Sequence, residues 1–358
     1  MRYIKTIDIY ITKKFLGTFF YAIILIIMIV LVFDLAENLD EFLSSEAPVK
    51  VIILDYYLNF IPYFTNLFSG LFTFIAVIYF TSKMAYNTEI IAILSSGVSY
   101  RRLMVPYIFS ALIIAILSFV LGNYIIPPAN KTRIDFRNKY IKNYVTREFQ
   151  IHRQIEPGVY IFIRRFDNNN VGRDFVLERF EGKMLVEKLM ANNIRWDEQT
   201  GRWIINQYWK RTIKDGREEV VRGYRIDTTL NMRPEEYRTI RNETETMTTP
   251  VIKKQIESMK MRGVNPVEFE VEKHKRISGP FSVFILTLIG AGVASRKVKG
   301  GLGFHLGLGI LFSFSYILFL QISTVFAISG NMPPLIAVWI PNILYGIIAL
   351  VIIKWASR

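Results

Sequence analysis

Long stretches without Asp, Glu, Lys or Arg alternate with charged segments along the 358-residue chain. A helix needs roughly 20 apolar residues to cross the hydrocarbon core of a bilayer. Uncharged stretches of suitable length occur at Phe15–Phe33, Tyr56–Ser82, Leu103–Asn130, Ile277–Ser295 and Gly300–Ile353. The last is long enough for two helices, and Ser329–Pro334 has the composition of a turn in its middle. The pattern predicts an α-helical integral membrane protein with six transmembrane helices.

Basic residues in the short loops predict the orientation of these helices. In a six-helix arrangement they all fall on one side of the membrane, at Arg2, Lys5, Lys13, Lys14, Lys83, Arg101, Arg102, Arg296, Lys297, Lys299, Lys354 and Arg358. Positively charged short loops stay in the cytoplasm, so both termini are expected there. Residues 1–14 are predicted to form an interfacial helix rather than a cleavable signal peptide, because the apolar run that follows is too long.

A polar insert separates the third and fourth predicted helices. Val159–Ile163 alternates β-branched and aromatic residues, and turn signals at Asp197–Gly201 and Lys214–Arg217 separate further strand-like segments. Regularly spaced short strands predict an all-β domain, an antiparallel sandwich, over residues 131–249. Residues 250–276 are expected to form an amphipathic helical linker into the fourth transmembrane helix.

Composition excludes several classes of function. The formal net charge of +14 suggests nucleic acid at first sight, but 31 of the 44 bases and 22 of the 30 acids lie between Lys131 and Arg276. The charge therefore belongs to the polar insert of a membrane protein, and no nucleic-acid partner is expected. The absence of cysteine excludes a disulfide framework and a cysteine nucleophile.

Motifs for ATP or metal chemistry are missing from the sequence. No GxxxxGK[ST] loop occurs, so any ATP-driven process requires an ATPase on another subunit. The histidines His152, His274 and His305 are too far apart in the sequence to form a metal-binding motif, and no metal site is predicted.

A short apolar segment in a predicted cytoplasmic loop carries the most informative pattern. Residues 85–97 are too few to cross a bilayer; Asn87 or Thr88 is a candidate N-cap, and Gly97 is expected to end the helix. The apolar residues of this helix are Ile90, Ile91, Ile93 and Leu94. They require an apolar partner surface, and Glu89 could form an ion pair with a basic group on that partner. Alternatively they lie against the membrane interface and Glu89 complements the helix dipole. The residues by themselves leave both interpretations open.

Seven short segments form a recognisable set across the whole chain. They are Ile7–Ile11, Asn87–Ser99, Ile125–Asn130, Asn192–Asp197, His274–Arg276, Pro333–Pro334 and Trp339–Asn342. Together with the six helices and the insert between the third and fourth, they resemble the LptF/LptG permease family of the lipopolysaccharide export ABC transporter. The resemblance implies a permease subunit, without its own ATPase site, in the bacterial inner membrane.

The resemblance also implies an assembly. Two LptF/LptG-type permeases pair around a central cavity and are driven by a cytoplasmic LptB-type ATPase dimer that hydrolyses ATP with Mg, so this chain is expected to bind no cofactor. In such an assembly the insert is expected to be a periplasmic β-jellyroll that passes lipopolysaccharide to LptC- and LptA-type proteins. Residues 85–97 correspond to the family's coupling helix. This implies ATPase-coupling roles for Glu89, Ile90, Ile93, Leu94 and Gly97.

A basic cluster at the outer mouth of the fourth helix is the candidate lipid contact. Lys273, Lys275 and Arg276 are placed to meet lipid phosphates above an apolar wall. Basic side chains that anchor the helix by snorkelling are the alternative. The family tends to carry lysines at the outer end of the first helix, whereas this chain has the acids Asp34, Asp40 and Glu41 there.

Two glycines mark a candidate face for close helix packing. Gly303 and Gly307, at the start of the fifth predicted helix, have the GxxxG spacing that lets another helix approach closely. Packing within the subunit is one interpretation. A lateral gate against the partner permease is what the family suggests.

Two other classes of function remain as alternatives to an exporter subunit. A secondary transporter is disfavoured because the predicted spans carry no buried acid or base for ion coupling and no inverted repeat is evident. An envelope enzyme anchored in the membrane is disfavoured because the insert shows neither a nucleophile with its base nor a metal motif. Co-purification of an ATPase and a second six-helix protein would distinguish the exporter from both.

Overall fold

The structure of the protein is a computed structural model that describes residues 5–141, 145–147, 149–167, 170–214, 216–234, 238–240, 243–261, 264–296 and 301–357. Arg2, Lys297, Lys299 and Arg358, which contributed to the predicted orientation, lie outside these ranges. The chain forms two compact units. The helical unit comprises Met1–Ile141, Thr244–Ile252 and Val267–Arg358, and the β unit comprises Lys142–Glu243 and Lys253–Pro266.

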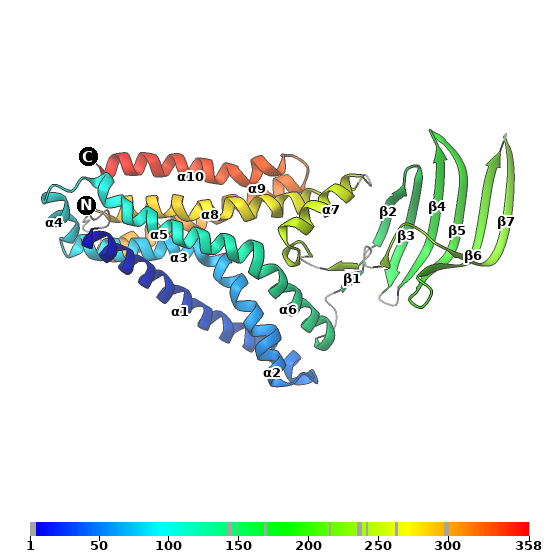
Figure 1. Cartoon of the computed structure of the whole chain (residues 1–358), viewed down its shortest axis with the longest axis horizontal. Helices are drawn as coiled ribbons and strands as arrows, with labels where there is room; N and C mark the ends of the chain where they lie inside the picture. The colour runs from blue at the N-terminus through cyan, green and yellow to red at the C-terminus, as the bar shows by residue number, and fades with distance from the viewer. Residues whose placement is uncertain are drawn as a thin grey trace. The chain divides into compact units, whose positions relative to one another are not determined.

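The helical unit confirms the predicted number of membrane helices. Within the described ranges, six helical runs are long and apolar enough to cross a membrane. They are α1 (Thr6–Ser44), the run of α2 (Val49–Val51), η1 (Ile52–Tyr57) and α3 (Leu58–Tyr86), the run of α5 (Tyr100–Val120), η2 (Leu121–Ile125) and α6 (Ile126–Tyr140), α8 (Val267–Ala294), α9 (Gly301–Ile328) and α10 (Pro334–Ala356). The short helix α4 (Glu89–Ser95) joins α3 to α5 and lies at the end of this unit that also holds both chain termini (Figure 1).

The helices extend beyond the uncharged stretches. The third run passes the predicted boundary at residue 130 and ends at Tyr140, after the π-helical turn η2. Pro127 and Pro128 lack the backbone N–H groups that would bond to carbonyls of the preceding turn, and η2 lies at that turn. The sequence analysis did not predict the π-helical turns. The segment 250–276 is divided between α7 (Thr249–Met261) and the first turns of α8.

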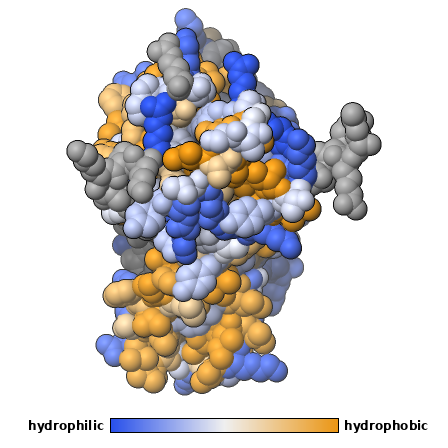
Figure 2. Space-filling model, turned by 90° about the vertical axis from the view of Figure 1, so that its left-hand side faces the viewer, coloured by the Kyte–Doolittle hydropathy of each residue, from blue (hydrophilic) through white to orange (hydrophobic). Residues whose placement is uncertain are grey.

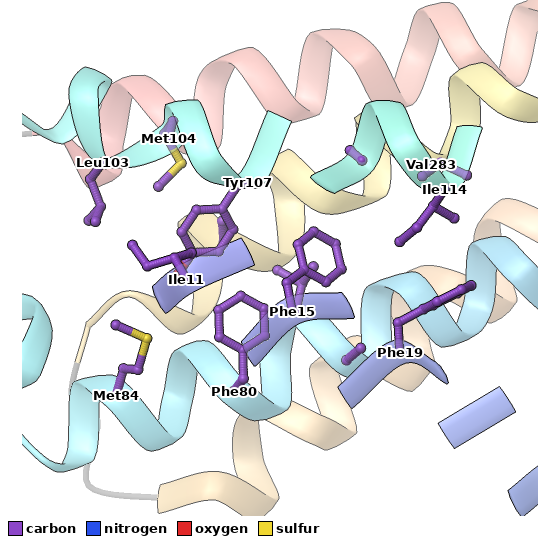
Figure 3. Close-up of a cluster of buried hydrophobic side chains, with 14 of the residues drawn as sticks. Ile11, Phe15, Phe19, Phe80, Met84, Leu103, Met104, Tyr107, Ile114 and Val283 are labelled. Atoms are coloured by element: carbon purple, nitrogen blue, oxygen red, sulfur yellow. The ribbon is translucent and has the colours of Figure 1, made fainter. Parts of the chain in front are cut away.

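Aromatic and aliphatic side chains form a dense core near α4, mainly from α1, α3 and α5 with contributions from α4 and α8. Ile11 and Phe15 of α1 pack against Phe80 of α3 and Tyr107 of α5 (Figure 3). Phe15 and Phe80 have ring centroids 5.4 Å apart, and Phe80 and Tyr107 are 5.3 Å apart. Burial of such large side chains is a major stabilising contribution. The core therefore fixes the N-terminal half of α1 to α3 and α5.

The β unit confirms the predicted all-β insert. Six antiparallel strands follow one another in the order β2-β3-β4-β5-β6-β7. Their bounds are β2 (Phe149–Glu156), β3 (Val159–Asp167), β4 (Val171–Glu181), β5 (Met184–Asp197), β6 (Arg202–Lys214) and β7 (Arg217–Thr228), and β1 (Val145–Arg147) pairs with β8 (Arg238–Ile240). Two turns fall where the sequence predicts them, between β5 and β6 and between β6 and β7. Trp203 is fully buried in the core of the sheet and donates a hydrogen bond from Nε1 to the carbonyl of Met232, at 3.0 Å.

Candidate functional site

The short helix α4 is the first part of the candidate site. Its N-cap is Thr88, one of the two predicted residues, but Thr88 has left-handed backbone geometry (φ 61°) and makes no capping hydrogen bond with its side chain. Gly97 follows the helix with φ +86°, a conformation that favours glycine. The two left-handed residues turn the chain sharply on each side of α4. They separate it from α3 and α5 as a helix of its own.

Glu89, in the first turn of α4, is bound to α1 of its own chain. Its carboxylate lies 3.1 Å from Lys14 Nζ and accepts a hydrogen bond from the Tyr10 hydroxyl at 2.8 Å. Lys14 also lies over the Tyr10 ring, 4.3 Å from its centroid. Asn87 donates a further hydrogen bond to the same carboxylate at 3.3 Å. Two donors from α1, Tyr10 and Lys14, therefore hold the start of α4.

The donors around Glu89 decide the ionisation of its carboxyl group. Burial opposes ionisation, but the hydrogen bonds from Tyr10, Lys14 and Asn87 outweigh it and lower the pKa of Glu89 below its ordinary value. Glu89 is therefore an anion at neutral pH, bound to Lys14.

A second ion pair ties the beginning of α1 to α5. Arg102 donates two hydrogen bonds to Asp8, at 2.7 and 2.6 Å, in the bidentate geometry that gives strong and directional pairs. Asp8 also accepts a hydrogen bond from the backbone N–H of Lys5 at 2.9 Å. The N-terminal turns of α1 are thus bound to α4 through Glu89 and to α5 through Arg102.

The apolar residues of α4 divide into an inner and an outer group. Ile90 is buried and belongs to the core of α1, α3 and α5, and Ile93 packs against that core. Ile91 and Leu94 are exposed, at 56% and 36% of their surface. Viewed from this end of the molecule, hydrophobic side chains lie among hydrophilic ones (Figure 2). The predicted apolar residues of this helix therefore have two different environments, and among them only Ile91 and Leu94 are exposed.

The predicted lipid-contact residues lie in the first half of α8, away from α4 along the helix. Arg276 is almost fully buried, with 4% of its side chain exposed. It donates hydrogen bonds to Glu272 Oε1 (2.8 Å), to the carbonyls of Met247 (2.8 Å) and Thr244 (3.0 Å), and to Thr249 Oγ1 (3.3 Å). A phosphate contact by Arg276 stays a prediction, and it would require some of these bonds to be exchanged.

The two lysines of this cluster have different surroundings. Lys273 and Lys275 are both half-buried. Lys275 interacts electrostatically with Glu272 and Glu245, whereas Lys273 lies beside His274. Their contact with lipid likewise stays a prediction.

The glycines of α9 separate into open and packed positions. A Cβ added at Gly303 or Gly307 would meet no atom of the described structure within 4 Å. A Cβ at Gly309 would lie 2.6 Å from Cδ1 of Ile78 in α3. The close packing of α9 inside the subunit therefore involves Gly309, and the GxxxG face of Gly303 and Gly307 is open. Its role at a gate stays a prediction.

The partners of Glu89 and Arg276 could not be predicted from the sequence. Lys14 and Tyr10 lie 75 and 79 positions before Glu89, and Lys14 served only as a signal of orientation. The carbonyl groups of Thr244 and Met247 carry no sequence signal, because every residue has one. No local pattern could have identified either set of contacts.

These observations define a multi-pass membrane protein with a β domain inserted after its third membrane helix and a short helix fixed to its first. The chain belongs to the lipopolysaccharide export system permease LptF/LptG family, whose model matches residues 9–355. It is similar to the lipopolysaccharide export system permease protein LptG of Haemophilus influenzae, at 20% identity over 364 aligned residues that cover 98% of each protein. The family and the six apolar helices together identify a multi-pass permease of the inner membrane.

Proposed function

We propose that this protein is the transmembrane permease subunit of an ABC exporter. It extracts lipopolysaccharide from the inner membrane and passes it to a periplasmic bridge of LptC- and LptA-type proteins. A second LptF/LptG-type permease completes the membrane part, and a separate LptB-type ATPase dimer hydrolyses ATP with Mg. Both termini and α4 are cytoplasmic in this proposal, and the β unit is periplasmic.

The observation that carries the proposal is the construction of α4. The helix offers Ile91 and Leu94 to a partner on its outer side, while Ile90 and Glu89 attach its inner side to the membrane helices. A partner that moves α4 must therefore move the N-terminal half of α1 as well, through Lys14 and the shared core. This arrangement suits the transfer of motion from a cytoplasmic ATPase to the membrane.

The cargo determines what the outer half of the helical unit must provide. Lipopolysaccharide carries phosphate groups and acyl chains, and charge-assisted hydrogen bonds from bases recognise phosphates strongly. Lys273 and Lys275 are the residues of the predicted cluster that we retain as phosphate contacts. Arg276 has the internal partners described above.

Purification of the protein with its native partners tests the proposal. Mass spectrometry of the detergent-solubilised complex should detect a cytoplasmic ATPase, a second six-helix permease and bound lipopolysaccharide. The ATPase activity of this complex should respond to added lipopolysaccharide. A protein that purifies alone, or with a cargo other than lipopolysaccharide, would contradict the proposal.

Substitution of Glu89 tests the role of α4 directly. Glu89→Ala should leave membrane insertion intact but lower the lipid exported per ATP hydrolysed by about tenfold, equivalent to about 1.4 kcal/mol of lost coupling. Lys14→Glu combined with Glu89→Lys restores an ion pair between α1 and α4 and should recover part of the loss. Transport at the wild-type level by Glu89→Ala would refute the assignment.

A further inference from the structure

The segment Thr244–Ile252, here called the strap, is part of the helical unit although the chain on both sides of it belongs to the β unit. It follows β8 and contains most of a short 3-10 helix (Glu243–Thr246) and the first residues of α7. Its placement depends on side chains from three parts of the helical unit.

Arg276 of α8 provides the first attachment. Its guanidinium group donates to two strap carbonyls, Thr244 and Met247, and to the Thr249 hydroxyl, while Nε is bound to Glu272 one turn earlier in α8. Because a buried guanidinium must have its donors satisfied, this side chain and the strap depend on one another. The sequence neighbours Lys273 and Lys275 have no such set of partners in the described structure.

Asn123 provides the second attachment, from the π-helical turn η2. The Thr249 hydroxyl donates to Asn123 Oδ1 at 2.6 Å, and the Asn123 amide nitrogen donates to the carbonyl of Phe119 at 2.9 Å. Asn123 is buried. Single π-helical turns within α-helices are frequent at functional positions, and this one carries the residue that receives the strap.

Glu245 provides the third attachment. Its carboxylate is within 3.5 Å of the Tyr63 hydroxyl of α3 and of the Asn130 amide of α6. Burial, reinforced by the neighbouring Glu272, raises the pKa of Glu245, whereas Arg133 and Lys275 act in the opposite direction. The strap thus contacts α3, the η2–α6 region and α8 within a few residues.

We infer that Arg276 is a positioning residue that fastens the strap to α8, so that Thr249 and Glu245 of the strap are held against η2, α3 and α6. The anchor holds these helices at a fixed spacing around the strap. Resting on the proposed function, it also keeps α3, η2, α6 and α8 at that spacing while the ATPase moves α4. Arg276 acts through the strap in this role and needs no contact with lipid.

Hydrogen exchange in lipid-free detergent tests the anchor without any assumption about cargo. Arg276→Ala should raise the exchange rate of the strap amides by about tenfold or more, because removal of the guanidinium frees three strap acceptors. Thr249→Val should raise it by about threefold, and Thr249→Ser, which keeps the hydroxyl, should match the wild type. Lys254→Ala on the exposed side of α7 is the charge-matched control. Unchanged exchange in both Arg276→Ala and Thr249→Val would overturn the inference.

Transport measured in the reconstituted complex tests the positioning role. Thr249→Val should lower the lipid exported per ATP by about threefold while ATP hydrolysis continues, and Thr249→Ser should restore it. Equal loss of hydrolysis and export would show that the strap serves only the stability of the fold, and this result would overturn the positioning role. If the wild-type complex exports no lipopolysaccharide, the proposed function fails, but the exchange experiment still decides whether the strap is anchored.

Discussion

Two ion pairs in the helical unit use the same chemistry but differ in the exposure of the cation. Lys14 and Glu89 join α1 to α4 with 32% and 26% of their side chains exposed, whereas Arg276 and Glu272 lie beside the strap with 4% and 23% exposed. Water can replace either partner of the first pair at little cost. The second pair holds a buried guanidinium whose other donors are also bound, so separating it leaves a charge without partners.

The contrast indicates which end of the unit is built to move. Around α4, a partly exposed pair and an open apolar surface permit rearrangement when a partner binds. Around the strap, a buried hydrogen-bond network permits little rearrangement. We therefore interpret the α4 end as the input for motion and the strap as its fixed reference.

The largest expected effect is on stability, and it tests the contrast directly. Arg276→Ala should lower the free energy of unfolding by about 3–5 kcal/mol, since it removes one partner of a buried network. Lys14→Ala should lower it by no more than about 1 kcal/mol. Denaturation of the purified protein in detergent measures both. Similar losses in the two variants would remove the distinction between the two ends.

The second prediction concerns the open surface of α4. Ile91→Asp and Leu94→Asp should weaken binding of the ATPase by about 1–3 kcal/mol each, because both remove apolar contact at the centre of the exposed face. Stability of the permease itself should change by less than about 0.5 kcal/mol, as is usual for exposed positions. Ser95→Ala serves as the control on the same helix. Normal ATPase binding by both aspartate variants would exclude this surface as the docking site.

The third prediction uses the ionisation of Glu89. Because the folded structure lowers the pKa of Glu89 below its ordinary value of 4.5, the contribution of its contacts is present above that value and is lost as the pH falls through the lowered pKa. Protection of α4 amides, corrected for intrinsic exchange, should stay constant from neutral pH down to that ordinary value and decrease only below it. A loss of protection between pH 6 and 8 would assign the control of α4 to another group.

The smallest effects are expected at the glycines of α9. Gly307→Ala should change the stability of the isolated subunit by less than about 0.5 kcal/mol, because its Cβ would meet nothing within 4 Å. Gly290→Ala in α8 should cost about 1–3 kcal/mol, since its Cβ would lie 2.9 Å from the Phe74 ring. Equal costs would show that the GxxxG face is already packed within the subunit.

Much of the fold follows from local sequence patterns. Charge-free stretches of membrane length predicted six helices, and turn signals at Asp197–Gly201 predicted a hairpin that the sheet contains. Sequence could not divide the apolar residues of α4, because Ile90 and Ile91 are chemically identical and only the packing of α4 on the other helices buries one of them. Arg276 was grouped with the lysines of the predicted lipid cluster. Its true partners include backbone carbonyls of the strap, which no side chain in the sequence reveals.

The membrane helices, the all-β insert and the short helix between α3 and α5 could be predicted from local patterns, because helix length, strand alternation and turn residues depend on neighbours along the chain. The bond between Glu89 and Lys14 and the attachment of the strap to Arg276 follow from the packing of distant segments. Those contacts join residues separated by 75 and by 27 to 32 positions. Their energies depend on burial and on directed hydrogen bonds, which exist only after the helices have packed.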